Sequence, residues 1–558
     1  MFSKRFLIGL ISFLFPILLS AQTAQKQSAP LRFEDLSAEE QLGQTLTLSV
    51  DVDSAELFRP AIESGHVGTV LIQWGTYSLA QTRSLISKLQ KWAAKSPHKI
   101  PLLVAIDYEG GTVYTPITLG LDYLPTNMML SAAGDEDHTA TMAYLAGLEL
   151  RRTGIHINFS PVLDVNNNPR NPIIGVRSFG SDPANVTKMG LALMNGFKAA
   201  GIVSVVKHFP GHGDTSVDSH YQVPVVRTPY KELQQVHIAP FAQAIKNGVQ
   251  GVMTGHILYP ALDNREIATF SKPILQDLLR TQLGFEGLVV TDSLDMKATL
   301  SFCTIPNCAV RALLAGSDLI LLGRYVKPQY TFEQISKQQQ TNPDLQQRIT
   351  QAARKVFNLK QQLGLLGEPT DLPEPIDHAY RSELQQISRR AVTLVRDRTN
   401  ALPISSQPRN DKKPLACVVF FAPGRFADQL MPFTRPFLEK GWRVRSYNAA
   451  MTPQAIDARR ARACAQDTDL LVLTSLQWAD KTNINQKNII DELMQTYPKA
   501  ILISTMSPYD IPNYPQANTV LATYGINKYV LQTAADIILG NVKAQGTLPV
   551  DLPEGKQP

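Results

Sequence analysis

Short apolar runs alternate with stretches of helical periodicity along the first part of the chain. In Glu232–Asn247, for example, apolar residues recur every three or four positions, as on one face of a helix. Eight apolar runs have the length of β-strands: Thr45–Val50, Val67–Ile72, Leu102–Ile106, His156–Val165, Ile202–Val206, Gly251–His256, Leu288–Thr291 and Leu319–Leu322. Alternating strands and helices are typical of a parallel sheet with helical crossovers. We therefore predict a (β/α)8 barrel of the TIM type over residues 30–325.

The periodicity changes after Tyr325. Residues 326–385 contain a polar, Gln-rich stretch, a helical segment over Arg348–Leu366 and a Pro-rich acidic stretch over Glu368–Pro375, which predicts a connecting region that ends in a linker. Five further strand-length runs follow: Cys417–Phe421, Arg443–Tyr447, Leu470–Thr474, Ile501–Thr505 and Thr519–Thr523. With helices between them, these runs predict a smaller, open α/β sandwich domain over residues 386–558.

The first residues have the layout of a secretory signal peptide, which we place at residues 1–24. Lys4 and Arg5 precede an apolar run, Phe6–Leu19, and small residues follow it. The run is short for a membrane span, which needs about 20 residues, and Pro16 interrupts it. An uncleaved membrane anchor is the alternative. We expect export to the periplasm or the medium, without stable membrane insertion after signal cleavage.

Composition and cysteine use narrow the function classes. Of the 558 residues, 44% are apolar and 18% charged, which is ordinary for a globular protein, and the net charge of +6 is not concentrated in one basic block. We therefore expect no nucleic-acid partner. Cys303 and Cys308 are close enough to form a small disulfide loop, whereas Cys417, within an apolar run, is interpreted as a buried thiol. Neither these residues nor Cys464 has a partner at metal-site spacing, and we predict no metal and no cofactor.

Polar residues directly follow, or end, many of the predicted barrel strands. They are Asp107, Glu109, Asp164, Lys207, His208, His256 and Asp292. The C-terminal ends of barrel strands surround one pocket, where the chemistry of such barrels is found. If these residues simply lay on solvated loops, nothing would explain why a charged group follows so many of the buried runs. The pattern therefore predicts a single polar pocket at this end of the barrel.

The segment Lys207–His220 is the richest in candidate chemistry. It leaves the fifth predicted strand and holds three histidines and two aspartates within fourteen residues. Imidazole and carboxylate groups suit zinc or iron, so a metal-dependent hydrolase that uses His208, His212 and His220 is one interpretation. A solvated loop, in which these side chains bind backbone amides, is another.

Four segments, in this order on a barrel, resemble glycoside hydrolase family 3. They are Ile106–Gly111 (Ile-Asp-Tyr-Glu-Gly-Gly), Asn171–Gly180 (which contains Arg-Ser-Phe-Gly), Lys207–His220 (Lys-His-Phe-Pro-Gly-His-Gly…Asp-Ser-His) and Gly287–Met296. The third is specific to the branch of bacterial β-N-acetylglucosaminidases that act on cell-wall fragments. The resemblance continues into the second domain at Ala522–Gly525 and Gly546–Val550.

The resemblance implies a role for individual residues. Asp292 matches the nucleophile, which would form a covalent glycosyl-enzyme with net retention; Asp295 is a rival on sequence alone but does not match the family position. Asp218 and His220 match a dyad in which the histidine protonates the leaving oxygen and then deprotonates water. An imidazole suits both steps because it titrates near neutral pH. The implied substrate-binding residues are Asp107, Arg177, Lys207, His208 and His256, while His212 is expected to organise its loop.

Two departures from the family pattern bear on the expected function. Thr112–Pro116 lacks the arginine that commonly follows the first segment, and Ser293 stands where a second acidic residue is usual. A non-catalytic sugar-binding protein would tolerate such changes, but it would need neither a nucleophile nor the Asp218/His220 dyad. We therefore expect an enzyme that removes terminal β-linked N-acetylglucosamine from cell-wall or chitin-derived fragments. A phosphorylase that uses the same residues is the alternative, because a neutral imidazole repels phosphate less than a carboxylate does.

Overall fold

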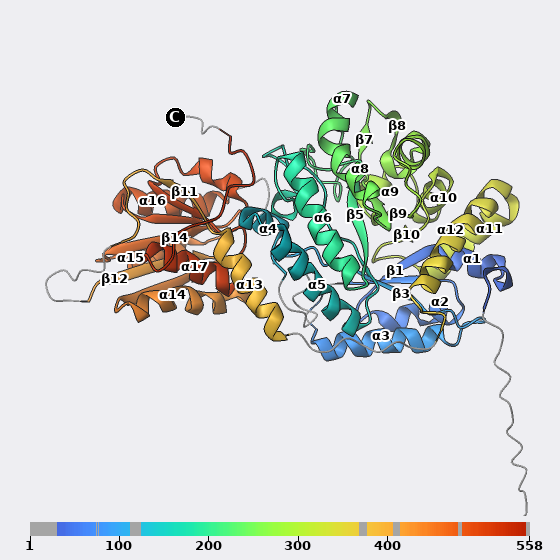
Figure 1. Ribbon diagram of the computed structural model, residues 1–558, viewed down its shortest axis with the longest axis horizontal. Helices are drawn as coiled ribbons and strands as arrows, with labels where there is room; N and C mark the ends of the chain where they lie inside the picture. The colour runs from blue at the N-terminus through green and yellow to red at the C-terminus, as the bar shows by residue number, and fades with distance from the viewer. Residues whose placement is uncertain are drawn as a thin grey trace, which may run out of the picture.

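The structure is a computed structural model that describes residues 31–73, 75, 77–111, 124–367, 377–404, 413–477 and 483–553. The predicted signal peptide (1–24), the Thr112–Pro116 segment and the predicted linker stretch Glu368–Pro375 lie outside these residues. Within the described ranges, no helix combines the length and hydropathy needed to cross a membrane. Two domains lie side by side, with the N-terminal domain on the right in Figure 1.

The N-terminal domain contains an eight-stranded parallel sheet in the order β10-β1-β2-β3-β4-β5-β6-β9. Its strands are β1 (Leu46–Val50), β2 (Thr69–Ile72), β3 (Leu103–Ile106), β4 (Ile157–Asn158), β5 (Val203–Phe209), β6 (Gly251–Thr254), β9 (Leu288–Thr291) and β10 (Ile320–Leu321). A parallel bridge between Val290 and Leu319 connects the two ends of this order and closes the barrel. The predicted (β/α)8 barrel is confirmed, and each predicted run overlaps one of these strands, although β5 extends beyond its run to Phe209. A short antiparallel hairpin, β7 (Leu258–Tyr259) and β8 (Asp263–Ile267), follows β6.

Helices surround the barrel and connect its strands (Figure 1). They are α1 (Ala38–Gln44), α2 (Arg59–Glu63), α3 (Leu79–Ala93), α4 (Asn127–Ala133), α5 (Glu136–Thr153), α6 (Pro183–Ala199), α7 (Tyr230–Glu232), α8 (Ala239–Lys246), α9 (Lys297–Leu300), α10 (Ile305–Ala315), α11 (Pro328–Thr341) and α12 (Pro343–Gln362). Caps define the longer helices: Ser78 and Asp182 accept hydrogen bonds from the first backbone N–H groups of α3 and α6. The Gln-rich part of the predicted connecting region forms α11 and the start of α12, and α12 packs on α1 and α10.

Strand alternation explains how the barrel directs polar residues into its interior. Successive side chains of a strand point to opposite faces. Leu103 and Ala105 of β3, Val203 and Val205 of β5, and Leu288 and Val290 of β9 belong to one buried cluster. Two positions further along the chain stand Asp107, Lys207 and Asp292. Their side chains therefore point to the same face as this cluster, toward the interior of the barrel. The apolar interior of the barrel thus continues into a polar end.

The C-terminal domain is built on a six-stranded sheet in the order β11-β16-β15-β14-β12-β13. The strands are β11 (Thr393–Asp397), β12 (Leu415–Phe421), β13 (Arg443–Ala449), β14 (Leu470–Ser475), β15 (Ile501–Ser504) and β16 (Thr519–Ala522), and the helices are α14 (Leu430–Glu439), α15 (Ala455–Ala465), α16 (Ile484–Thr496) and α17 (Lys528–Ile538). The five predicted strands are confirmed. The sixth, β11, was not predicted; it is an edge strand that pairs antiparallel with β16 and ends in Arg396 and Asp397.

Both pairs of cysteines are joined in disulfides. Cys303 and Cys308 form the small loop that their spacing allows, with Cα atoms 5.4 Å apart. The interpretation of Cys417 as a buried thiol was wrong, because Cys417 on β12 is bonded to Cys464 on α15. Helix α15 packs against β12, which brings together two cysteines that are 47 positions apart in the sequence.

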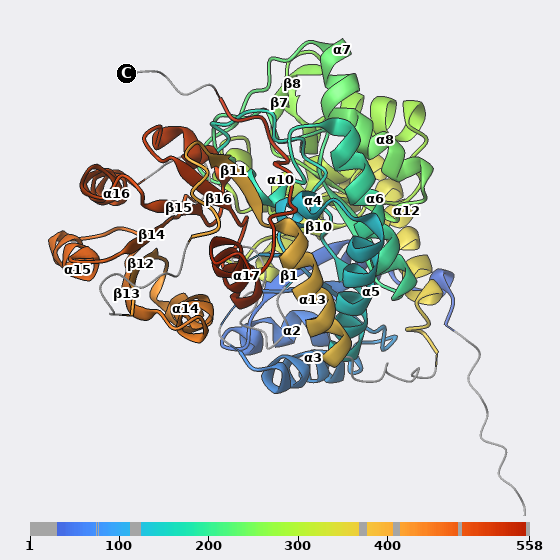
Figure 2. The ribbon, with the colours of Figure 1, turned by 60° about the vertical axis from the view of Figure 1, so that its left-hand side comes forward.

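The two domains share a continuous hydrophobic core. Helix α13 (Asp377–Ala391) packs against α4 and α5 of the barrel and against α17 of the second domain; Figure 2 shows it between α5 and α17. Backbone hydrogen bonds join the C-terminal segment to the barrel, from Thr547 N to Ala132 O and from Ser181 N to Pro549 O. The hydroxyl of Tyr509 donates a further hydrogen bond to the Asn166 carbonyl, at 2.8 Å.

Candidate active site

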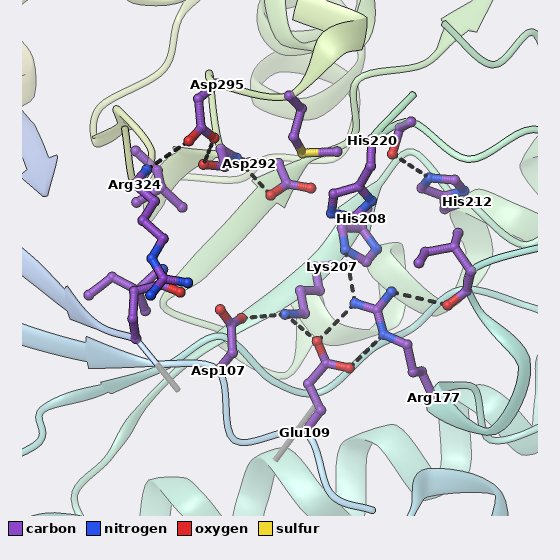
Figure 3. A pocket seen from close by; sticks show the side chains of 17 residues that line it. Asp107, Glu109, Arg177, Lys207, His208, His212, His220, Asp292, Asp295 and Arg324 are labelled. Atoms are coloured by element: carbon purple, nitrogen blue, oxygen red, sulfur yellow. Dashed lines mark hydrogen bonds and ion pairs between the residues drawn. The ribbon is translucent and has the colours of Figure 1, made fainter. Parts of the chain in front are cut away.

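A cavity opens at the C-terminal ends of the barrel strands. Its lining includes most of the residues that the sequence singled out: Asp107, Arg177, Lys207, His208, His212, His220 and Asp292. Glu109, Asp295 and Arg324 lie in the same lining, and Figure 3 shows these charged side chains as a ring around the cavity. The described residues of the lining all come from the barrel domain. The predicted convergence of strand-end residues on one pocket agrees with this geometry.

A network of four charges forms one side of the cavity (Figure 3). The Arg177 guanidinium donates two hydrogen bonds to the Glu109 carboxylate, at 2.7 and 2.8 Å. The Lys207 ammonium lies 2.7 Å from Asp107 and 2.6 Å from Glu109. Burial opposes the charge on Lys207, but the carboxylates of Asp107 and Glu109 outweigh it and raise the lysine pKa. Lys207 is therefore held as a cation between the two carboxyl groups.

Glu109 was not among the predicted substrate-binding residues, although it stands in the Asp-Tyr-Glu-Gly-Gly segment. Its carboxyl is 2% exposed. Burial opposes its ionisation, yet the adjacent Arg177 and Lys207 lower its pKa to about 2. The signal in the sequence was the spacing: an acidic residue two positions beyond Asp107. Glu109 acts as the buried counter-charge for two cations rather than as a surface acid.

Replacing Glu109 with glutamine is expected to destabilise the fold. The Glu109→Gln variant leaves Arg177 and Lys207 buried with one carboxylate fewer, and breaking a buried ion pair in this way costs about 3–5 kcal/mol. Urea denaturation at neutral pH measures the loss. Glu439→Gln, which breaks an exposed pair with Arg435, is the control and should cost less than about 1 kcal/mol.

The pH dependence of this difference has a definite sign. Because the folded-state pKa of Glu109 is depressed, its contribution is complete above the ordinary glutamate pKa and is lost as the pH falls toward about 2. The stability gap between wild type and Glu109→Gln should therefore narrow in acid. A gap that stays constant between neutral pH and pH 3 would contradict the assigned ion pair.

Asp164 anchors the two buried histidines of the cavity. It ends the fourth predicted run and is completely buried. One oxygen accepts the ring Nδ1–H of His208 at 2.7 Å, and the other accepts the backbone N–H groups of His208 and His212. Burial opposes its ionisation, but His208 and these hydrogen bonds lower its pKa. Burial also lowers the pKa of His212 to about 4, so this ring is neutral, and it lies between Thr215 and Ser219.

Asp218 and His220 form a hydrogen-bonded pair on the loop after β5. One oxygen of Asp218 accepts both the backbone N–H and the ring Nδ1–H of His220, each at 2.8 Å. The hydrogen bond that His220 donates to Asp218 raises the His220 pKa, against the effect of partial burial, and Asp292 acts in the same direction. Because Nδ1 is occupied, Nε2 is the ring nitrogen available for proton transfer. The imidazole is half-exposed and lines the cavity.

The loop that carries this pair is fixed by a buried asparagine. Asn171 donates hydrogen bonds through its side-chain amide to the carbonyls of His212 and Gly213 and to the Thr215 hydroxyl. The side-chain oxygen Oδ1 of Asn171 accepts hydrogen bonds from the backbone N–H groups of Ile173 and Ile174. The segment that positions Arg177 and the loop that positions His220 are thereby held together.

Asp292 follows β9 and points into the cavity (Figure 3). Burial opposes its ionisation, but His256, His208 and His220 around it, together with a 2.7 Å hydrogen bond from the Ser293 backbone N–H, lower its pKa to about 2. The group is therefore a carboxylate at neutral pH. An anionic carboxylate in a cavity with a protonatable imidazole is the pair that a double displacement at an acetal carbon requires.

His256 does not line the cavity among the described residues. It is buried, and its ring Nε2–H donates to the Ser293 carbonyl at 3.0 Å, while Nδ1 lies 2.7 Å from the Thr269 hydroxyl. The structure thus places His256 behind the nucleophile segment, where it fixes the backbone next to Asp292. Its predicted contact with substrate has no geometric support in this position.

The segment after Asp292 is tied to the end of β10. The Ser293 hydroxyl donates to one oxygen of Asp295, and the backbone N–H of Arg324 donates to the other, both at 2.7 Å. Asp295, the rival nucleophile on sequence alone, is therefore occupied by two donors. Ser293 and Asp295 together hold the segment after β9, which carries Asp292, against the segment after β10.

The three histidines of the predicted metal alternative have different partners. His208 binds Asp164, His212 lies between two hydroxyls, and His220 binds Asp218. In the part of the chain that the structure describes, no three His, Cys, Asp or Glu side chains are arranged to hold a metal ion. The arrangement of the histidines is that of separate hydrogen-bonded pairs.

Comparisons with known proteins agree with this fold and define the class of the protein, a glycoside hydrolase. The model for the N-terminal domain of glycosyl hydrolase family 3 matches residues 37–359, and the chain belongs to this family. β-Hexosaminidase A of Pseudoalteromonas piscicida is 31% identical over 547 residues, covering 87% of this chain and 88% of that protein. A β-N-acetylglucosaminidase/β-glucosidase of Cellulomonas fimi is 27% identical over 554 residues, covering 93% and 94%. The structure of a glycoside hydrolase family 3 β-N-acetylglucosaminidase from Paenibacillus sp. str. FPU-7 superposes with a TM-score of 0.82 at 30% identity, covering 93% of this chain and 99% of that one.

Proposed function

We propose that the protein is a retaining exo-β-N-acetylglucosaminidase that removes terminal β-linked N-acetylglucosamine. The observation that carries the proposal is the ionised Asp292 in the same cavity as His220, whose ring is hydrogen-bonded to Asp218. The names of similar proteins support the sugar, since the relatives from Pseudoalteromonas piscicida, Cellulomonas fimi and Paenibacillus are named as hexosaminidases or N-acetylglucosaminidases.

In the first step, Asp292 attacks the anomeric carbon as the bond to the leaving oxygen breaks. His220 supplies the proton that this oxygen needs, and Asp218 stabilises the charged ring before the transfer. The product is a glycosyl ester on Asp292 with inverted configuration. The raised His220 pKa keeps the ring protonated to a higher pH than a free histidine and favours this step.

In the second step, His220, now neutral, removes a proton from water as the water attacks the same carbon. The bond to Asp292 breaks, its carboxylate is restored and the configuration inverts again, which gives net retention. One imidazole thus serves as acid and then as base. The position of Nε2, opposite the nitrogen held by Asp218, allows both transfers.

The charge network of Asp107, Glu109, Arg177 and Lys207 supplies the polar contacts that a sugar needs. Hydroxyl groups left unpaired in a buried pocket cost affinity, and fixed donors and acceptors avoid this cost. Because the four charges neutralise one another, a neutral sugar can bind without leaving an uncompensated charge. We assign the acetamido and hydroxyl contacts to this network and to His208.

We also propose that the protein acts outside the cytoplasm, on cell-wall or chitin-derived fragments. The signal-like N-terminus motivates the location. The two disulfides support it, because disulfides persist mainly in oxidising compartments. A fractionation of the producing cells, with the N-terminus of the mature protein sequenced, tests export and signal cleavage together.

The activity is tested with the purified protein on aryl β-N-acetylglucosaminide and aryl β-glucoside, with and without phosphate and chelator. We expect release from the acetamido substrate, with the β-anomer of N-acetylglucosamine as the first product. If sugar 1-phosphate forms when phosphate is added, the reaction is phosphorolysis, in which phosphate takes the place of water. Preference for the glucoside, an α-anomer as first product or loss of activity with chelator would overturn the proposal.

A further inference from the structure

Arg324 lies on the wall of the cavity across from the histidines (Figure 3). It follows β10, and no pattern in the sequence marked it as a site residue. Its side chain is 46% exposed, and its backbone N–H is fixed by Asp295. In Figure 3 the guanidinium extends toward the side of the cavity that holds Asp107.

A buried carboxylate holds the Arg324 side chain in this position. Asp51 follows β1, is 8% exposed and accepts the Arg324 Nη2–H at 3.0 Å. Ser54 donates two further hydrogen bonds to Asp51, from its backbone N–H and its hydroxyl. Among the described residues, Asp51 is the one side chain that accepts a hydrogen bond from this guanidinium. A guanidinium has five N–H groups, so Arg324 retains donors for a ligand.

The other two cations of the lining are more fully engaged. Arg177 gives two hydrogen bonds to Glu109, and Lys207 contacts both Glu109 and Asp107. The segment after the third strand supplies no further cation, because residues 112–123 include no Arg, Lys or His. Arg324 therefore brings from the eighth strand a cation whose donors are available on the cavity side.

We infer that Arg324 is a sugar-binding residue that donates hydrogen bonds to a hydroxyl at the C4–C6 end of the terminal sugar. The inference rests on the proposed function, in which the anomeric carbon lies between Asp292 and His220. The leaving group then departs on the His220 side. In a pyranose ring C4 lies opposite C1, so the wall formed by Arg324 and Asp107, away from His220, meets the other end of the sugar (Figure 3).

The test compares wild type with Arg324→Met, which keeps much of the aliphatic stem and removes the charged donors. Substrates are aryl β-N-acetylglucosaminide and its 4-deoxy and 6-deoxy analogues. We expect kcat/KM on the parent sugar to fall at least about tenfold, because a hydrogen bond to a charged group is lost. On the analogue that lacks the contacted hydroxyl, wild type and variant should differ by less than about twofold, and Arg324→Lys should recover part of the loss on the parent sugar.

Arg462→Met is the matched control, since Arg462 is 52% exposed and paired with Glu492 in the C-terminal domain. It should leave kcat/KM unchanged. An Arg324→Met variant that folds and matches this control on the parent sugar overturns the inference, as does an equal loss on the parent and both deoxy sugars. If wild type itself fails to cleave the parent sugar, the proposed function falls instead, so the two failures are distinguishable.

Discussion

Asp292→Ala is expected to lower kcat/KM on aryl β-N-acetylglucosaminide by about 10⁴-fold or more, the scale seen when a catalytic nucleophile is removed. Asp292 is ionised at neutral pH because three imidazoles and the Ser293 amide outweigh its burial. Without the carboxylate, no glycosyl ester can form. Steady-state release of the aryl group measures the loss, and thermal unfolding checks that the variant is folded.

Two controls make this result specific. Asp295→Asn removes the neighbouring carboxylate, which binds Ser293 and Arg324 rather than the anomeric carbon, and should retain far more activity than Asp292→Ala. Added azide should partly restore Asp292→Ala and yield the α-glycosyl azide, because a small anion in the vacated space displaces the aglycone directly. If Asp292→Ala keeps wild-type activity, or if azide gives the β-anomer, Asp292 is not the nucleophile.

His220→Ala is expected to have the second-largest effect, and its size depends on the leaving group. Loss of a general acid costs roughly 10²–10⁴-fold when the leaving oxygen needs a proton. For a methyl or methylumbelliferyl glycoside kcat/KM should fall by this amount, whereas for a dinitrophenyl glycoside, whose oxygen leaves unprotonated, it should change little. An equal loss on both substrates would contradict the acid role. Azide should accelerate this variant and give the β-glycosyl azide, opposite to Asp292→Ala.

The pH profile tests the partner of His220. Glycosylation needs the protonated imidazole, so kcat/KM on poor leaving groups falls as the pH rises through the His220 pKa. That pKa is raised chiefly by the hydrogen bond to Asp218. In Asp218→Asn the falling limb should therefore move to lower pH. If the falling limb stays at the same pH while overall activity drops, Asp218 supports the structure of the loop but does not raise the His220 pKa.

The barrel could be predicted because its strands are buried on both faces and therefore read as continuous apolar runs. Asp107, Lys207 and Asp292 stood out because each is a charged residue that directly follows such a run. β11 was missed for the opposite reason: Thr393–Asp397 is a partly exposed edge strand with two charged residues, and its pairing depends on the distant β16.

The parts of the site that escaped prediction depend on three-dimensional partners. The position of Glu109 after the third strand predicted its place in the polar pocket, but its role as a counter-charge depends on Arg177, 68 positions away. Arg324 follows a two-residue strand and gains significance only beside Asp51. The Cys417–Cys464 bond likewise depends on how α15 packs. The segments that resemble a known family carried Asp218 and His220, which their burial and charge alone would not have distinguished from a solvated loop.

The hydrogen bond from Tyr509 to Asn166 connects the C-terminal domain to the backbone near the active-site cavity, although the described lining of that cavity comes from the barrel domain. Asn166 is two residues beyond Asp164, which holds both buried histidines. Thermodynamic linkage then works in both directions: a ligand that favours the ordered Asp164 segment also favours the docked second domain, by the same free energy. Through this hydrogen bond the second domain holds the backbone two residues from the carboxylate that fixes His208 and His212.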